Sequence, residues 1–353
     1  MINKARAVGG SQQGVALTDE TCSYLIAVIA NDLGFSSSFP ELPNLPTPFF
    51  ATRVLEELQL PNSNLMALFE RLVGLDPNAD TYFACLATLH KSRLKYERIL
   101  QTQPLPTIDQ VGPRGLLQYG GLSPRALTSF LFWRKWMFDI DNRAGQETGY
   151  LFEPIIANAI GGVPIGTRRS PIYRDGNAAK GQRQVDCIRD GKAFEFKLRI
   201  TNAASGQGRW QEELDFPRDC RASGFTPILI VLDPTRNGKL EQLKRAFEQH
   251  GGETHIDDAW TYLDNLAGAT MAIFLERYVH EPLRALLADV PKGEADDETD
   301  LPELTLRMTK TTFTLVAAGE TFEVKRIPVA VDDARTEDAV DDARTEDVDT
   351  EAL

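Results

Sequence analysis

The dipeptide Asp190-Gly191 constrains this chain more than any other feature, because it separates two alternating runs within VDCIRDGKAFEFKLR, residues 185–199. A two-residue type I′ turn needs positive φ at both central positions, and Asp-Gly is one of the few pairs that adopt it. The sequence therefore predicts an antiparallel hairpin in which Arg189 faces Lys192.

The two faces of this hairpin differ in character, because side chains alternate along a strand with a period of two. One face is apolar and should be a core face: Val185, Cys187, Phe194, Phe196 and Leu198. The other face carries Asp186, Glu195 and Lys197. We expect Asp186 to lie opposite Glu195, where two like charges repel. Lys197 can reach the space between them, and a divalent cation with oxygen ligands would fill it better. The alternative is a solvated polar face that tolerates its charges.

Negative charge is concentrated near the C-terminus. Of the net charge of −13, residues 331–353 contribute −8 and residues 290–303 contribute −5. Residues 168–199 carry nine Lys or Arg against four acids, which is the local positive field that a phosphate backbone requires. The acidic total therefore does not exclude a nucleic-acid partner.

Several classes of protein are disfavoured. The chain has no apolar run long enough to span a membrane and no apolar signal segment at its start, so we expect a cytoplasmic protein without membrane contact. The four Cys and four His show no spacing typical of a zinc site or a disulfide framework. Phosphate-binding and serine-hydrolase motifs are also missing.

The composition divides the chain into four regions. We expect a helical N-terminal region at 1–140, an α/β core at 141–290, and an acidic linker with a possible β-hairpin at 291–330. The tail, 331–353, repeats VDDARTED and should be disordered. It would act either as an inert solvated segment or as an acidic mimic that competes with DNA for the basic surface.

The core region mixes helical and strand patterns. A helix is expected over 144–162, loop or irregular strand over 162–183, a second helix over 209–223 and a buried strand at 228–232. Together with the hairpin, these elements form a mixed sheet with helices packed against it.

This order of elements around Asp186, Glu195 and Lys197 resembles the PD-(D/E)xK nucleases, best known from type II restriction endonucleases. The resemblance covers roughly residues 145–235. It implies a restriction-endonuclease-like fold, Asp186 and Glu195 as Mg²⁺ ligands, and Lys197 as the residue that orients or deprotonates the attacking water. Val185 replaces the proline for which the motif is named. An acidic residue on the preceding helix commonly supports the metal site, and Glu153 or its rival Glu147 fits.

The chemistry explains these residue types. Hydrolysis of a phosphodiester adds negative charge to the phosphoryl oxygens, and a carboxylate-held Mg²⁺ neutralises that charge and lowers the pKa of bound water. Oxygen ligands favour Mg²⁺ over zinc.

Candidate contacts to double-stranded DNA flank the hairpin. Arg, Lys and amide side chains bind phosphates or base edges, and an aromatic side chain can stack on a base. The candidates are Arg168, Arg169, Arg174, Lys180 and Arg183 before the hairpin, and Asn202, Gln207, Arg209 and Trp210 after it. Each could also be an ordinary solvated surface residue.

The run from RGLLQYGGLSP at 114–124 to YLFEPIIANAIGG at 150–162 looks like the ApaLI-like group of restriction enzymes. That resemblance implies a homodimer cutting both strands of a palindromic hexanucleotide such as GTGCAC. Two other functions remain open: a structure-selective or repair nuclease with the same residues, and a non-catalytic DNA-binding protein of the same fold.

Overall fold

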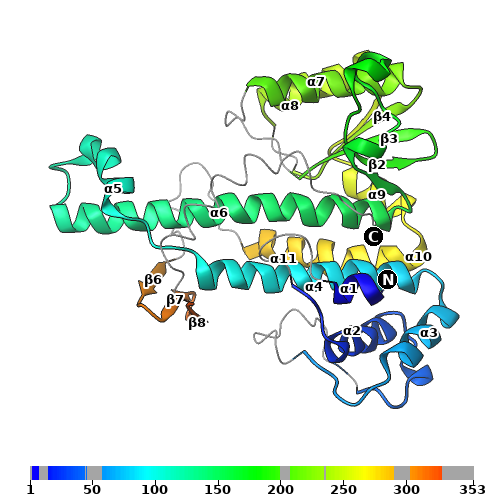
Figure 1. Ribbon diagram of the computed structural model, residues 1–353, viewed down its shortest axis with the longest axis horizontal. Coiled ribbons are helices and arrows are strands. Elements are labelled where there is room, and N and C mark those ends of the chain that lie inside the picture. Colours follow the sequence, from blue (N-terminus) through cyan, green and yellow to red (C-terminus); the bar gives the residue numbers. More distant parts are fainter. Residues whose placement is uncertain are drawn as a thin grey trace.

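The computed structural model describes residues 2–7, 15–43, 45, 58–198, 207–233, 236–289 and 303–327. A long helix, α6 (Pro124–Ala159), runs through the centre of the molecule (Figure 1). The Ser123 side chain caps it by accepting the N–H of Ala126, and Pro124 takes the first helical position. None of the described helices is long and apolar enough to cross a membrane.

Helix α6 joins two segments that the sequence pattern separates. The expected boundary between residues 140 and 141 falls inside it, so the same helix belongs to both regions. Gly145 lowers helix propensity by only about 1 kcal/mol relative to Ala, which packing against a neighbouring helix can offset. That neighbour is α4 (Ala79–Thr102).

Five strands form the mixed sheet beside the C-terminal half of α6. They are β1 (Val163–Ile165), β2 (Val185–Arg189), β3 (Lys192–Lys197), β4 (Thr226–Val231) and β5 (Glu253–His255), in the order β1-β2-β3-β4-β5. The first three strands are antiparallel, whereas β3, β4 and β5 are parallel. This confirms the expected mixed sheet flanked by helices.

The hairpin forms as the sequence predicts. Asp190 has φ 50° and Gly191 has φ 74°, and Arg189 pairs with Lys192. The regular pairing extends outward to Cys187 and Phe194.

One part of the expected alternation is wrong. Two steps along β1 correspond to three along β2, so β2 carries an extra residue between Val185 and Ile188. Such a bulge turns the side chains around it. Val185 therefore packs with Ala193 in one core cluster, whereas Cys187 and Phe194 belong to the cluster on the opposite face.

Helices cover both faces of the sheet (Figure 1). Helices α7 (Gln207–Ala222) and α8 (Gly238–Gln249) bury Phe216, Leu243 and Phe247 against one face. The C-terminal end of α6 and helix α9 (Ala259–Leu266) cover the other face. Every residue of β4 after Thr226 is buried, which confirms the buried strand expected at 228–232.

The remaining helices form a second core around α4. They are α1 (Ile2–Arg6), α2 (Asp19–Asp32), α3 (Leu65–Leu75), α10 (Ala269–Leu275) and a π-helical turn (Glu276–His280). Helix α11 (Glu281–Asp289) continues from this turn and is largely exposed. The buried carboxylate of Asp32 joins α2 to two segments distant in the sequence, because it accepts hydrogen bonds from Tyr82 at 2.9 Å and Tyr278 at 2.5 Å.

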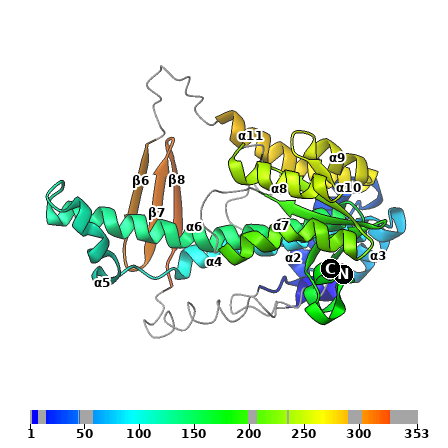
Figure 2. The ribbon, with the colours of Figure 1, turned by 90° about the horizontal axis from the view of Figure 1, so that it is seen from above.

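A separate antiparallel sheet follows the acidic linker. It has three strands, β6 (Leu304–Met308), β7 (Thr312–Ala317) and β8 (Glu320–Lys325), one more than the expected hairpin. Figure 2 shows this sheet beside the N-terminal half of α6, away from β1–β5. It packs there through Phe313, whose ring centroid lies 4.9 Å from that of Trp136. The repeated tail, 331–353, lies outside the described residues.

Candidate active site

Asp186 lies on β2 where the strand bulges. Its Oδ2 accepts the backbone N–H of Phe196 at 2.8 Å, so the carboxylate reaches across to β3 and takes the place of a backbone acceptor. The N–H of Phe196 lies between Glu195 and Lys197 in the chain. The bulge and this hydrogen bond therefore hold Asp186 against the part of β3 that carries the other two residues.

Lys197 lies between two carboxylates. Its Nζ is 2.8 Å from Oε1 of Glu195 and 3.5 Å from Oε1 of Glu213. Burial alone lowers the pKa of the lysine, but Glu195, Glu213 and Asp186 together raise it above the ordinary value. The ammonium group is therefore charged at any physiological pH.

Glu213 on α7 is a site residue that the sequence reasoning missed. Phe216 follows it by three residues and is buried against the sheet, so residues on that side of α7 point toward β3. This spacing was a usable signal, but only once α7 was known to lie on this face of the sheet.

Glu153 on α6 completes the acidic group. Burial first, and then the charge of Glu195, raise the pKa of Glu153 to about 7, with Lys197 acting in the opposite direction. The same two causes, burial and the charge of Glu195, raise the pKa of Asp186 well above its ordinary value. The like-charge repulsion expected from the sequence is therefore present. The side chain of its rival, Glu147, lies outside the described part of the structure.

The donor set suits a hard divalent cation. Within the described ranges, no three acidic, thiol or imidazole side chains are gathered closely enough to hold a metal ion by themselves. Mg²⁺ does not need such a cage, because it usually binds one or two carboxylates and completes its shell with water and substrate phosphate. Asp186 and Glu195 are two carboxylates of this kind, and the charge of Glu195 is one cause of the raised pKa of Asp186.

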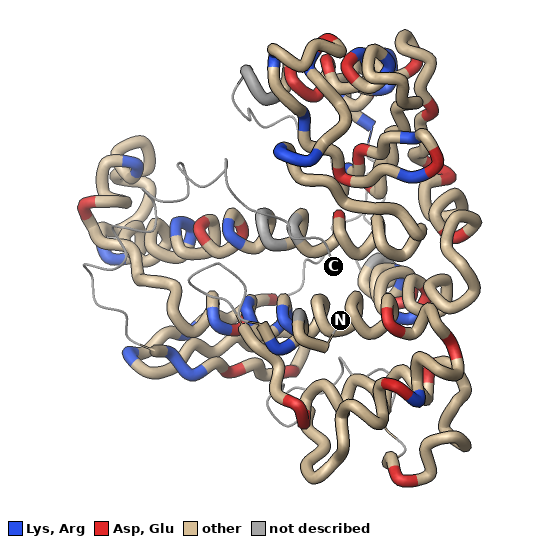
Figure 3. The backbone as a smooth tube through the Cα atoms, turned by 45° about the vertical axis from the view of Figure 1, so that its right-hand side comes forward, with Lys and Arg blue, Asp and Glu red and all other residues tan. Residues whose placement is uncertain are grey.

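The basic residues before the hairpin are mostly paired with acids. Arg183 donates to buried Asp219 at 2.7 Å and is itself nearly buried, so it serves the fold. Arg174 contacts Glu212 at 2.5 Å, and Lys180 contacts Asp175 at 2.5 Å. Figure 3 shows Lys and Arg interleaved with Asp and Glu over this lobe.

The other expected DNA contacts differ in placement. Arg168 and Arg169 are exposed on a short 3-10 turn after β1. Trp210 on α7 donates to Gln242 at 3.3 Å, and the Lys239 ammonium lies 5.1 Å from the centre of its ring. Asn202 and the side chains of Gln207 and Arg209 lie outside the described residues.

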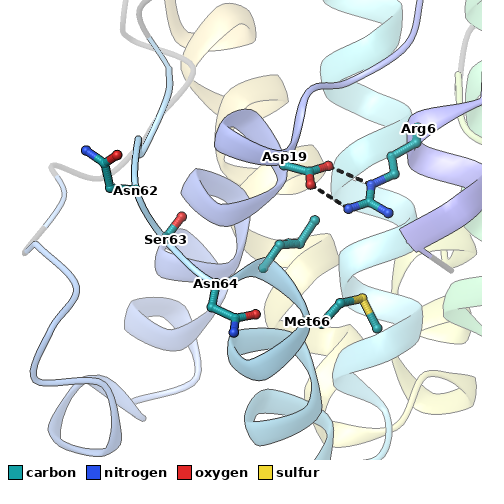
Figure 4. Close-up of a pocket in the computed structure, with 7 residues that line it drawn as sticks. Arg6, Asp19, Asn62, Ser63, Asn64 and Met66 are labelled. Carbon is teal, nitrogen blue, oxygen red and sulfur yellow. Dashed lines mark hydrogen bonds and ion pairs between the residues drawn. The ribbon is translucent and has the colours of Figure 1, made fainter.

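A separate cavity of about 570 Å³ lies among the N-terminal helices (Figure 4). It is lined by residues of α1, α2 and the start of α3, and by Asn62 and Ser63 in the segment before α3. Two hydrogen bonds of 2.6 Å join Arg6 to Asp19 at its edge. None of the expected catalytic residues lines it.

Comparisons with known proteins identify the family of this chain. Residues 52–280 match the family described as ApaLI-like restriction endonuclease. The chain is 44% identical over 323 residues to "Type II restriction enzyme ApaLI" of Acetobacter pasteurianus, covering 86% of each protein. No solved structure matches. This chain therefore belongs to the ApaLI-like type II restriction endonucleases, enzymes that cleave DNA at specific sites.

Proposed function

We propose that Asp186, Glu195 and Lys197 form the PD-(D/E)xK catalytic centre of this restriction endonuclease, with Mg²⁺ as its cofactor. One observation carries the proposal. The Lys197 ammonium lies 2.8 Å from Glu195 on β3, and the Asp186 carboxylate is bound to the backbone of the residue between them.

The three residues have different roles. Bound Mg²⁺ would neutralise charge on the phosphoryl oxygens and lower the pKa of a bound water. Asp186 and Glu195 provide the oxygen ligands that hold it. In the metal-free protein the carboxylate neighbours of Lys197 raise its pKa. Lys197 would stabilise the negative charge that develops on phosphate, and it would orient or deprotonate the attacking water.

Glu153 supports the site from α6. Its raised pKa, about 7, means that the carboxyl group is partly protonated at neutral pH without a cation. A cation between Asp186 and Glu195 would favour the charged form of Glu153, which would then accept a hydrogen bond from a water in the metal's shell.

The substrate is double-stranded DNA, and the proposed recognition site is palindromic and cut by a homodimer in the cytoplasm. Arg168 and Arg169 are exposed and are the first choice for phosphate contacts. The segment that contains Asn202 and precedes α7, together with Gln207, Arg209 and Trp210, is proposed to contact DNA from the other side of the site.

Substituting Asp186→Asn tests this assignment. The Asn side chain can still accept the N–H of Phe196, but one metal ligand and one repelling charge are lost. We expect no cleavage of unmodified DNA and a melting temperature in EDTA at least equal to that of the parent. Adding Mg²⁺ should raise the melting temperature of the variant much less than that of the parent.

Asp190→Asn is the matched control. It removes a carboxylate from the same hairpin but keeps an Asn-Gly turn. It should cleave DNA, and Mg²⁺ should raise its melting temperature as much as that of the parent. Cleavage by Asp186→Asn would overturn the assignment, as would a rise in its melting temperature with Mg²⁺ equal to that of the parent.

A further inference from the structure

Residues 105–138, here called the apolar arm, carry a concentration of exposed large apolar side chains. The arm contains α5 (Ile108–Val111), a 3-10 helix (Gly112–Gln118) and the start of α6. Of the eighteen exposed large apolar side chains among the described residues, nine belong to this arm. We propose that the apolar arm binds the same surface of a second copy of this chain.

The tip of the arm is folded so that apolar side chains face outward. Exposed fractions are 97% for Leu117, 75% for Leu116 and 72% for Tyr119. Val111, Leu127 and Leu131 form a small core beneath them. The tip is thus anchored by its own core and still presents two leucines to solvent.

Gly115 explains how the tip is held in place. A Cβ added at this glycine would lie 2.6 Å from Cδ1 of Leu131. Any other residue here would force the Leu131 side chain to move, so glycine suits the close approach of the 3-10 helix to α6. With the backbone fixed against α6 at Gly115, the next two side chains, Leu116 and Leu117, point away from it.

The exposed surface continues along α6. Phe130, Met137 and Phe138 are 45%, 44% and 59% exposed. Spacings of seven and eight residues place these three side chains on one face of the helix. Leu105, Ile108 and Leu122 of the apolar arm are exposed as well.

The combined area of these side chains is comparable with that of an interface. With on the order of 100 Å² for each exposed Leu or aromatic side chain, nine of them offer about the roughly 800 Å² that each partner contributes to a standard protein–protein interface.

The charge of the tip favours a protein partner over DNA. Between residues 105 and 122 the only charged residues are Asp109 and Arg114. The rest of the arm adds Arg125, Arg134 and Lys135, and Lys135 pairs with Asp139. Surfaces that bind DNA are strongly positive, whereas the cores of protein interfaces are depleted in charge.

A second copy is the occupant that the enzyme's task requires. This inference rests on the proposed function, in which each chain has one catalytic centre and both strands of the duplex are cut. A twofold interface pairs the same patch on both chains, and dimers of this kind are the commonest oligomers. Helix α6 carries both the arm and Glu153, so an interface on the arm would fix the two centres relative to each other.

The test compares Leu116→Glu/Leu117→Glu with the parent and with Leu286→Glu. Leu286 is 67% exposed on α11, outside the arm, so it controls for a charge placed on an exposed leucine. Mass is measured by analytical ultracentrifugation, with and without a DNA duplex that the parent binds in Ca²⁺. We expect twice the chain mass of 39.2 kDa for the parent and the control.

The arm variant should be monomeric, with a dimer dissociation constant raised by on the order of 100-fold or more. With Mg²⁺ on supercoiled plasmid it should give nicked circles in place of linear product. A parent that is monomeric both free and on DNA would overturn the inference, as would an arm variant that stays dimeric. An arm variant that stays dimeric but loses DNA affinity would assign the arm to DNA instead.

These outcomes do not depend on the catalytic assignment. If the parent is dimeric through the arm but Asp186→Asn still cleaves DNA, the proposed catalytic centre fails while the interface stands. If Asp186→Asn is inactive and the arm variant stays dimeric, the interface fails alone.

Discussion

Lys197 has a second carboxylate partner, Glu213, beyond the one in its own motif. When a cation binds Glu195, this carboxylate is shared between the cation and the Lys197 ammonium group. Glu213 on α7 then remains to hold the ammonium group in position. We expect Glu213→Gln to lower kcat about tenfold, which is about 1.4 kcal/mol, and to leave KM unchanged, because DNA is bound elsewhere.

Glu212→Gln is the control, because this neighbouring carboxylate pairs with Arg174 at the surface. Glu213→Asp should recover part of the lost rate. A change in KM with kcat unchanged would show that Glu213 binds DNA and does not position Lys197.

Glu153 makes the stability of the metal-free enzyme depend on pH. Its pKa in the folded protein, about 7, lies above the ordinary value of 4.5, so the folded protein binds this proton more tightly than the unfolded chain. The stabilisation from this carboxyl is present below pH 4.5 and is lost as the pH rises toward 7 and above.

Glu153→Gln should therefore be more stable than the parent at pH 8 in EDTA, and the difference should vanish toward pH 4.5. Thermal melts across this range measure it. A difference in stability between variant and parent that is constant with pH would mean that folding does not raise the pKa of Glu153.

At the scale of elements, the hairpin was predictable and its bulge was not. Asp-Gly determines the turn locally, so the pairing of Arg189 with Lys192 follows from the sequence. The extra residue in β2 arises from pairing with β1, twenty residues earlier in the chain, and alternation alone cannot predict it. Glu213 was missed for the same reason, since its role depends on how α7 docks on the sheet.

The continuity of α6 is another feature that local pattern did not predict. Gly145 lies in its middle, is exposed, and has nothing within 4 Å of the position of an added Cβ. Gly145→Ala should therefore stabilise the protein by about 0.5–1 kcal/mol in urea unfolding and leave cleavage intact.

Gly191→Ala provides the comparison, because its φ of +74° disfavours any side chain. That substitution should destabilise the hairpin. If Gly145→Ala were destabilising as well, α6 would be broken near residue 145.

At the scale of the whole molecule, the charge of the chain is divided between a nearly neutral body and an acidic C-terminus. Residues 331–353 carry eight of the thirteen net negative charges. Deleting them should leave cleavage intact and tighten DNA binding at low salt, with the difference disappearing at high salt because exposed charges are screened. Equal affinities for both proteins at low salt would favour inert solvation over competition with DNA.

The central claim is that Lys197 acts in the cleavage step, whereas other residues bind the DNA. Single-turnover cleavage in Mg²⁺ and gel-shift affinity in Ca²⁺ should be measured for Lys197→Ala and for Lys192→Ala. Lys192 lies on the same strand but contacts Glu253 and Tyr262, so it is the matched control. We predict that Lys197→Ala binds DNA with nearly the parental affinity and does not cleave it, whereas Lys192→Ala does both. Cleavage by Lys197→Ala at the parental rate would contradict the account.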